Sequence, residues 1–172
     1  YITAEDVGTS PQDMAHVATQ TRYVAGLGAS GDPSPYTALG CFVGAQTAVK
    51  HHFKRDTMDG LTVALQGLGH VGFDYARRLH AAGAKLVVAD IDEAALERAR
   101  TEFGAEVVGV DAIYDVEADI YAPCALGATL NPHTLSRLRV KIVAGGANNP
   151  LATDEIGDML RQKGVLYTPD FV

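Results

Sequence analysis

The feature that most restricts the fold of this chain is a regular alternation of two hydrophobic periods after Gly60. Short apolar, β-rich runs alternate with segments whose apolar residues recur at helical spacing. The strand-like runs are residues 62–66, 85–90, 106–108, 119–122, 140–144 and 165–167, and the helical segments are 69–82, 93–103, 131–137 and 153–163. Strands separated by helices pair in parallel, because the chain must cross over between them. The sequence therefore predicts an α/β fold with a doubly wound, mostly parallel sheet and helices on both faces.

Two more helices are expected before the sheet. Ser-Pro pairs at positions 10–11 and 34–35 combine a capping side chain with a residue that suits the first helical turn. The helices expected from them are residues 11–22 and 35–52. A chain of 172 residues is long enough for one domain with a core of its own. We therefore expect a single domain, made of a hinge segment (residues 1–35) and a sheet core (residues 36–172).

The stretch QGLGHVG (residues 66–72) joins the first predicted strand to the helix that follows it. In a dinucleotide-binding turn, Gly67 would permit the tight bend, Gly69 would let main-chain N–H groups approach a diphosphate, and Gly72 would let the helix pack closely on the strand. The helix N-terminus would add roughly half a positive charge. The loop residues between these glycines are Leu68, His70 and Val71, and His70 is interpreted as a tolerated side chain. The pattern predicts a Rossmann-like dinucleotide site.

A carboxylate follows the second predicted strand at the expected place. Asp90 lies 18 residues beyond Gly72, where such folds use an acid to bind the adenosine ribose hydroxyls. Ile91 and Asp92 come next, with no Arg or Lys to receive a 2′-phosphate. We therefore predict NAD rather than NADP as the cofactor, with Asp90 and Ile91 among its contacts. The alternative is a glycine-rich turn in a domain that binds no nucleotide, with Asp90 capping the next helix.

Composition excludes several classes of protein. A net charge of −7 and a pI near 5.2 argue against nucleic acid or an anionic membrane surface as a partner. No apolar run reaches the roughly 18 residues that a membrane helix needs. Two distant cysteines and six histidines without a ligand-like spacing predict no disulfide framework and no metal site. These features favour a cytoplasmic location.

Six stretches, five of them outside the glycine loop, carry a family resemblance. They are YITAEDVGTS (1–10), GDPSPYTALG (31–40), QGLGHVG (66–72), YAPCALGATLN (121–131), VAGGANNPL (143–151) and GVLYTPDFV (164–172). In these stretches the chain resembles the glutamate, leucine, phenylalanine and valine dehydrogenases, most closely the leucine/valine/phenylalanine branch. The resemblance implies reversible oxidative deamination of an L-amino acid to a 2-oxo acid and ammonia, with hydride transfer to NAD.

The resemblance also implies an aspartate that moves protons to and from the amine nitrogen. That residue belongs to the motif matched here by AEDVG, so the implied catalytic residue is Asp6. A carboxylate that is partly removed from water suits acid–base chemistry near neutral pH. The alternative is that Asp6 caps a turn before Gly8.

The family's catalytic lysine has no counterpart in this chain. It lies in a glycine-rich motif of an N-terminal substrate domain, and none of the five lysines here has that setting: Lys50, Lys54, Lys85, Lys141 and Lys163. The helices that follow the family's equivalent of PDFV are missing as well. We expect the substrate domain and the C-terminal helices to lie outside this chain, and the isolated chain to bind NAD without turnover.

The resemblance implies further contacts at the nicotinamide end. Thr37 resembles a family threonine near the carboxamide; the alternative is a hydroxyl bonded to its own helix. Asn148 resembles the family asparagine near the nicotinamide ribose and substrate, and the glycines at 145 and 146 would let the backbone approach the ligand. The alternatives are a left-handed turn at Asn148, or Asn149 as the true contact.

Three residues after the fourth predicted strand complete the candidate site. Parallel sheets place ligands at strand ends, which favours Cys124, Ala125 and Leu126 as cofactor contacts. Cys124 has no His or Asn partner pattern and is interpreted as a packing residue rather than a nucleophile.

Two other classes of protein compete with the dehydrogenase interpretation. The first is an autonomous NAD(H)-binding sensor or regulatory module without catalysis. The second is a complete small enzyme of another dinucleotide-dependent kind, which is disfavoured because no base-plus-nucleophile or metal set remains once Asp6 is set aside. For a dehydrogenase, the partners are an L-amino acid and its 2-oxo acid, and the full-length protein is expected to be a homo-oligomer. The preferred side chain of the substrate is expected to depend mostly on the substrate domain outside this chain.

Overall fold

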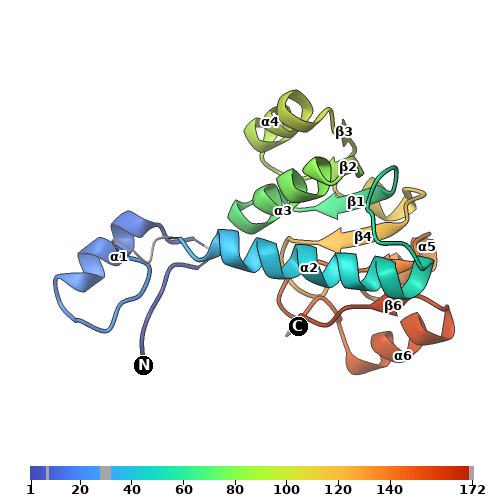
Figure 1. The fold of residues 1–172 in the computed structure, drawn as a ribbon. Coiled ribbons are helices and arrows are strands. Elements are labelled where there is room, and N and C mark those ends of the chain that lie inside the picture. Colours follow the sequence, from blue (N-terminus) through green and yellow to red (C-terminus); the bar gives the residue numbers. More distant parts are fainter. Residues whose placement is uncertain (7, 28–31, 171–172) are drawn as a thin grey trace.

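A computed structural model describes residues 1–6, 8–27 and 32–170 of the chain. Its six strands form one sheet in the order β3-β2-β1-β4-β5-β6 (Figure 1). The strands are β1 (Thr62–Gln66), β2 (Lys85–Ala89), β3 (Glu106–Val107), β4 (Ile120–Pro123), β5 (Ile142–Val143) and β6 (Leu166–Tyr167). All five ladders that join them are parallel. The predicted doubly wound α/β fold is confirmed, and the strand order reverses between β1 and β4.

Helices pack against both faces of the sheet, as predicted. The first face carries α2 (Ser34–Phe53), α3 (His70–Ala81) and α4 (Glu93–Phe103), and the second carries the 3₁₀ turn η2 (Ala112–Asp115), α5 (Pro132–Arg137) and α6 (Asp154–Gln162). Successive side chains of a strand point to opposite faces, so Val63 and Leu65 enter the first core and Ala64 enters the second. Because both faces are buried, β1 is a continuous apolar run rather than an alternating one.

Several expected strand boundaries are wrong, mainly at the sides of the sheet. Runs 106–108 and 140–144 shorten to Glu106–Val107 and Ile142–Val143. β3 pairs with only two residues of β2. The length of a strand depends on where its partner strand ends, and the pattern of side chains along one strand does not contain that information. β2 ends at Ala89, which leaves Asp90 in the loop that follows.

The first helix is shorter than expected. α1 (Pro11–Ala18) begins with a capping box between Ser10 and Asp13, as the sequence indicates, but it ends at Ala18 instead of residue 22. The Thr19 hydroxyl donates to the carbonyl of His16 (2.7 Å), which offers the backbone a turn in place of another helical turn. In Figure 1, α1 projects away from the sheet. No helix in the described residues has the length and apolarity to cross a membrane.

The start of α2 differs from the expected cap. Ser34 is the first residue of the helix rather than its N-cap, and the carboxylate of Asp32 accepts a hydrogen bond from the Ser34 N–H (2.8 Å). Asp32 thus supplies a capping oxygen at this end of the helix, because the N–H of the first helical residue has no partner within the helix. This places Asp32 beside the glycine loop.

A buried polar network secures the end of β1 just before the glycine loop. Gln66 is 6% exposed, and its Oε1 accepts hydrogen bonds from the hydroxyls of Tyr121 (2.5 Å) and Tyr114 (3.1 Å). Its Nε2 lies 3.0 Å from the Tyr114 hydroxyl and 3.3 Å from the carbonyl of Val110. A buried amide with satisfied partners adds rigidity, so the loop that follows starts from a fixed strand end.

Candidate functional site

Glycine occurs at positions 67, 69 and 72 of the loop for different structural reasons. Gly67 has φ +99°, a left-handed conformation that favours glycine, and a Cβ there would lie 2.6 Å from the Ala125 nitrogen. A Cβ on Gly72 would lie 2.0 Å from the Gly67 carbonyl oxygen. A Cβ on Gly69 would meet no atom of the described chain within 4 Å. Packing therefore requires glycine at 67 and 72, whereas the space above Gly69 is open.

The N-terminus of α3 opens onto that space. α3 begins at His70, and its N-cap is Gly69, which has no side chain to accept hydrogen bonds from the first helical N–H groups. Such N–H groups have no partner within a helix, and they carry the positive end of its dipole. This end of α3 is suited to receive an anion.

A cleft of about 640 Å³ lies at the carboxyl ends of β1 and β4, where the strand order reverses. The size is typical of a cofactor site. Its walls come from the hinge segment, the start of α2, the glycine loop and the loops after β4 and β5: Glu5, Asp6, Gly8, Thr9, Asp32, Pro33, Ser34, Thr37, Gly69, His70, Val71, Gly72, Cys124, Ala125, Leu126, Gly127, Gly146, Ala147 and Asn148. The fold thus brings together ten of the residues singled out from sequence: Asp6, Thr37, Gly69, His70, Val71, Gly72, Cys124, Ala125, Leu126 and Asn148.

The other four sequence-predicted residues lie around the loop rather than on the cleft wall. Asp90 accepts hydrogen bonds from the N–H groups of Leu68 and, at 2.8 Å, Asp92. Asp92 is the N-cap of α4 and accepts from the Ala94 N–H (2.9 Å), so Asp90 is not the helix cap. Asp90 therefore binds the glycine loop to the end of β2. The Leu68 side chain and Gly67 are buried, while Ile91 is 87% exposed.

Asp6 lies on the cleft wall within a compact turn. The turn is held by the main chain of Asp6 and the side chain of Thr9: the Thr9 hydroxyl donates to the Asp6 carbonyl (2.8 Å), and the Asp6 N–H donates to that hydroxyl (2.9 Å). Both hydrogen bonds use backbone atoms of Asp6. The side chain is exposed at the mouth of the cleft.

The two candidate asparagines have different surroundings. Asn148 lines the cleft, whereas Asn149 has φ +48° and donates its N–H to the Asp170 carboxylate (2.7 Å). The left-handed turn residue is therefore Asn149. The glycine at 145 is explained by packing rather than by a ligand, because a Cβ there would lie 2.2 Å from the Pro123 carbonyl.

Thr37 lies between two cavities at the start of α2. Its hydroxyl is 3.5 Å from the Pro33 carbonyl, at the outer limit of a hydrogen bond. The residue lines the main cleft and also a smaller cavity of about 150 Å³ that it shares with Cys41, Asn148 and Thr168. The hydroxyl is thus only loosely bound to its own helix.

Cys124 follows β4 at the floor of the cleft. Burial raises the pKa of its thiol to about 12, although a hydrogen bond from the Gly146 backbone opposes the shift. The thiol is therefore protonated near neutral pH and is a poor nucleophile. Its Cβ lies 3.1 Å from the position that a Cβ on Gly72 would take, so Cys124 packs against α3. The neighbouring Leu126 is 70% exposed.

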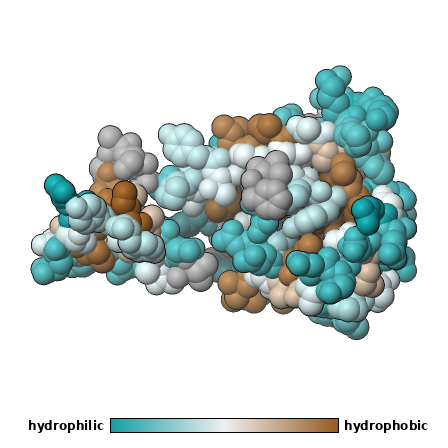
Figure 2. All heavy atoms as spheres, turned by 90° about the horizontal axis from the view of Figure 1, so that it is seen from below, coloured by the Kyte–Doolittle hydropathy of each residue, from teal (hydrophilic) through white to brown (hydrophobic). Residues whose placement is uncertain are grey.

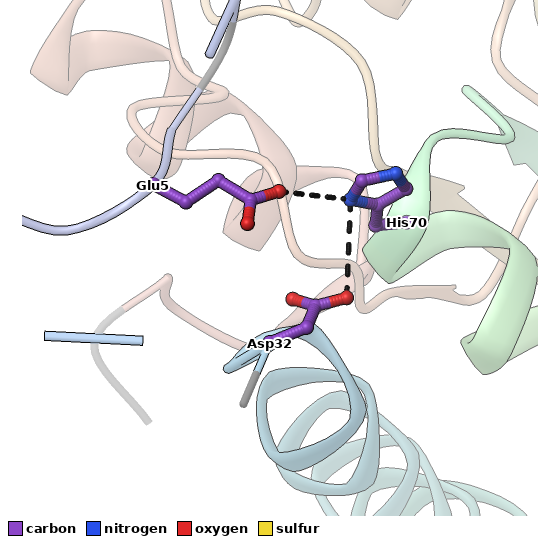
Figure 3. Close-up of side chains that lie close together, drawn as sticks. All are labelled: Glu5, Asp32 and His70. Carbon is purple, nitrogen blue, oxygen red and sulfur yellow. Dashed lines mark ion pairs between the residues drawn. The ribbon is translucent and has the colours of Figure 1, made fainter. Parts of the chain in front are cut away.

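Sequence reasoning missed a contact of His70. Contrary to its interpretation as a tolerated side chain, its Nδ1 lies 3.3 Å from Oε1 of Glu5 and 3.9 Å from Oδ2 of Asp32 (Figure 3). Partial burial raises the pKa of Asp32, but hydrogen bonds from Ser34 and the nearby imidazole outweigh it, so the net pKa lies below its usual value. The three side chains come from distant parts of the chain, so no local pattern could have found them.

The lysines of the chain lie elsewhere. No lysine is among the residues that line the cleft in the described part of the chain. Lys50 pairs with Asp56 (2.8 Å) and is 70% exposed, and Nζ of Lys163 donates to the Leu135 carbonyl (2.6 Å). These lysines serve the surface and the packing of helices, as the sequence suggests.

The walls of the cleft come from two parts of the molecule, the hinge segment and the body of the sheet. In the space-filling view of Figure 2, the described part of the hinge segment forms a small lobe to the left of the body of the sheet. Hydrophilic and hydrophobic side chains are interspersed on the face shown. Residues from both parts, such as Asp6 and Gly69, line the cleft.

Comparisons with known proteins agree with this geometry. Residues 89–172 match the family model described as Glutamate/Leucine/Phenylalanine/Valine dehydrogenase. Over its whole length the chain is 52% identical to a leucine dehydrogenase of Thermoactinomyces intermedius and 39% identical to a phenylalanine dehydrogenase of Lysinibacillus sphaericus, and it covers 48% of each. The crystal structure of L-tryptophan dehydrogenase from Nostoc punctiforme matches with a TM-score of 0.83 and 42% identity, over 99% of this chain and 49% of that one. The chain spans about half the length of these relatives, and over its whole length it is similar to the glutamate/leucine/phenylalanine/valine dehydrogenases.

Proposed function

We propose that the cleft binds NAD and that the chain is the NAD-binding part of an L-amino acid dehydrogenase. Such an enzyme interconverts an L-amino acid with its 2-oxo acid and ammonia. The similarity to this family implies a nicotinamide cofactor. The observation that supports the proposal most is the junction of the glycine loop, the α3 N-terminus and Asp90 beside one cleft at the switch point.

The residues present fit a dinucleotide. The open space above Gly69 would admit a diphosphate, which the first N–H groups of α3 would bind. Asp90 would accept hydrogen bonds from the ribose hydroxyls through lone pairs that its two backbone donors leave available. Thr37 and Asn148 would lie toward the nicotinamide, with Ala125 and Leu126 along the floor. When bound, the nicotinamide ring supplies the hydride acceptor.

Asp90 is expected to decide between NAD and NADP. Its carboxylate would repel a 2′-phosphate, and Asp90→Asn removes that charge while its amide oxygen keeps an acceptor for the Leu68 N–H. We expect Asp90→Asn to lower the preference for NAD over NADP at least about tenfold, the scale of one lost charged hydrogen bond. Calorimetric titration with both cofactors measures this. An unchanged ratio would place the adenosine ribose elsewhere, and Asp158→Asn, on the far helix α6, is the matched control.

Asp6 would move protons between the reacting amine nitrogen and water. Asp6 lies on the cleft wall, and its hydrogen bonds with Thr9 fix its backbone there, which suits a group that exchanges protons with a bound substrate. A lysine would have to come from the part of the protein outside this chain. We further propose a nonpolar L-amino acid as substrate, because the relatives include leucine and phenylalanine dehydrogenases.

A non-catalytic NAD(H) sensor is the second candidate, and it is favoured by the lack of a lysine among the cleft residues of the described chain. The isolated chain is expected to bind NAD in calorimetry but not to oxidise leucine, valine or phenylalanine. The full-length protein is expected to oxidise at least one of them. Failure of the full-length protein to turn over any amino acid, with NAD binding intact, would support the sensor. Turnover by the isolated chain would show that the lysine is dispensable.

Two further proposals concern the oligomeric state and the cellular location of the full-length protein. We propose a homo-oligomer, as the resemblance to the amino acid dehydrogenases implies. We also propose a cytoplasmic location, since Cys41 and Cys124 are both free thiols.

A further inference from the structure

The charges around the cleft are unusual for an anion site. Its titratable lining residues, in the described part of the chain, are Glu5, Asp6, Asp32, Cys124 and His70. Three are carboxylates, and the thiol is held neutral by burial. Neither lysine nor arginine is among the lining residues. His70 is therefore the one basic side chain on the described wall.

The other charges near the start of α3 compensate one another. Asp74, one turn after His70, pairs with Arg77 (2.5 Å) and Arg78 (2.8 Å). From the hinge segment His70 faces Glu5, with Asp6 also on the wall, and from the residues before α2 it faces Asp32. A diphosphate at the α3 N-terminus would thus meet carboxylates on two sides and helical N–H groups on a third.

The orientation of His70 leaves one nitrogen available. Figure 3 shows Nδ1 turned toward Glu5 and Asp32, and the opposite edge of the ring turned away from both. The side chain of Glu5 is only 9% exposed, whereas that of His70 is 68% exposed. A neutral imidazole has one N–H, and only the imidazolium can donate from both nitrogens. It alone can donate to Glu5 and to a phosphate oxygen at the same time.

We propose that His70 is the counter-ion of the cofactor diphosphate, so that dinucleotide binding takes up a proton at its imidazole. The proposal rests on the proposed function of NAD binding. The bound diphosphate adds negative charge beside a ring that already faces two carboxylates, and this favours the protonated ring in the complex over the free protein. By linkage, the affinity for NAD falls as the pH rises through the range in which the ring loses its proton.

The test is calorimetric titration of the full-length protein with NAD, in the presence of a chelator that removes stray cations. Titrations at one neutral pH in buffers of different ionisation enthalpy give the number of protons taken up. We expect uptake of a fraction of a proton, and an affinity at least about fivefold higher near pH 6 than near pH 8. ADP-ribose, which keeps the diphosphate but lacks nicotinamide, should show the same uptake.

Variants separate this inference from a general structural effect. In His70→Gln the uptake should disappear and the affinity should vary less than about twofold over the same pH range. His51→Gln, an exposed histidine of α2 away from the cleft, should behave as wild type.

The outcomes are distinct. A wild-type protein that does not bind NAD contradicts the proposed function. Binding without proton uptake, or uptake that survives in His70→Gln, contradicts the role of His70 while leaving NAD binding in place. Proton uptake that is lost in His70→Gln but kept in His51→Gln supports the role of His70.

Discussion

Gly72→Ala is expected to destabilise the domain by about 3 kcal/mol and to weaken NAD binding at least about tenfold, since overpacking against rigid neighbours is costly. The new Cβ would lie 2.0 Å from the Gly67 carbonyl oxygen and 3.1 Å from the Cβ of Cys124. Neither neighbour is the end of a flexible side chain, so α3 must move away from the strand. Thermal unfolding followed by circular dichroism, together with calorimetric titration of NAD, measures both effects.

Gly69→Ala is the matched comparison within the same loop. A Cβ there meets no atom of the described chain within 4 Å, so the free protein should lose less than about 1 kcal/mol, the cost of alanine at an N-cap. The affinity for NAD should nevertheless fall at least about tenfold, because the methyl group occupies the space proposed for the diphosphate. Normal stability and affinity in Gly72→Ala would disprove the close packing, and normal affinity in Gly69→Ala would place the diphosphate elsewhere.

Asp6→Asn in the full-length protein is expected to lower kcat by about 10² to 10⁴, the usual contribution of a general acid–base group. The affinity for NAD should change less than about twofold, which is small against the cost of a lost charged hydrogen bond. The Asp6–Thr9 turn should persist, since the hydrogen bonds between these two residues involve the backbone of Asp6 and the side chain of Thr9. Steady-state kinetics with saturating NAD and amino acid, and separate NAD titrations, distinguish turnover from binding.

Two control variants accompany the Asp6→Asn experiment. Asp158→Asn removes an exposed carboxylate that pairs only locally with Arg161 on α6, and it should leave kcat unchanged. Thr9→Ala removes the two hydrogen bonds of the Thr9 hydroxyl but keeps the Asp6 carboxylate and the bond from the Thr9 N–H to the Asp6 carbonyl (3.0 Å), so a loss of activity there would measure how far the placement of Asp6 depends on that hydroxyl. Equal losses of kcat and NAD affinity in Asp6→Asn would indicate a structural role instead.

The fold was largely predictable because its signals are local. Runs such as residues 62–66 are apolar throughout, since both faces of β1 are buried, and the helical segments keep a different period. The ends of elements were less predictable. α1 stops at Ala18 because the Thr19 hydroxyl bonds back to His16, and β3 is cut to two residues by the reach of its partner strand. A ladder needs two strands, so its length is not a property of either sequence alone.

By itself, the sequence determined the parallel doubly wound fold, the glycine loop and the carboxylate after β2, because each depends on residues within one strand–turn–helix unit. Only the tertiary structure decided how Asp6, Asn148 and the loop share one cleft, that Asp90 binds the Leu68 N–H, and that Glu5 and Asp32 meet His70. These contacts join segments separated by tens of residues. Their geometry is set by the packing of the sheet and its helices, which no local spacing of residues records.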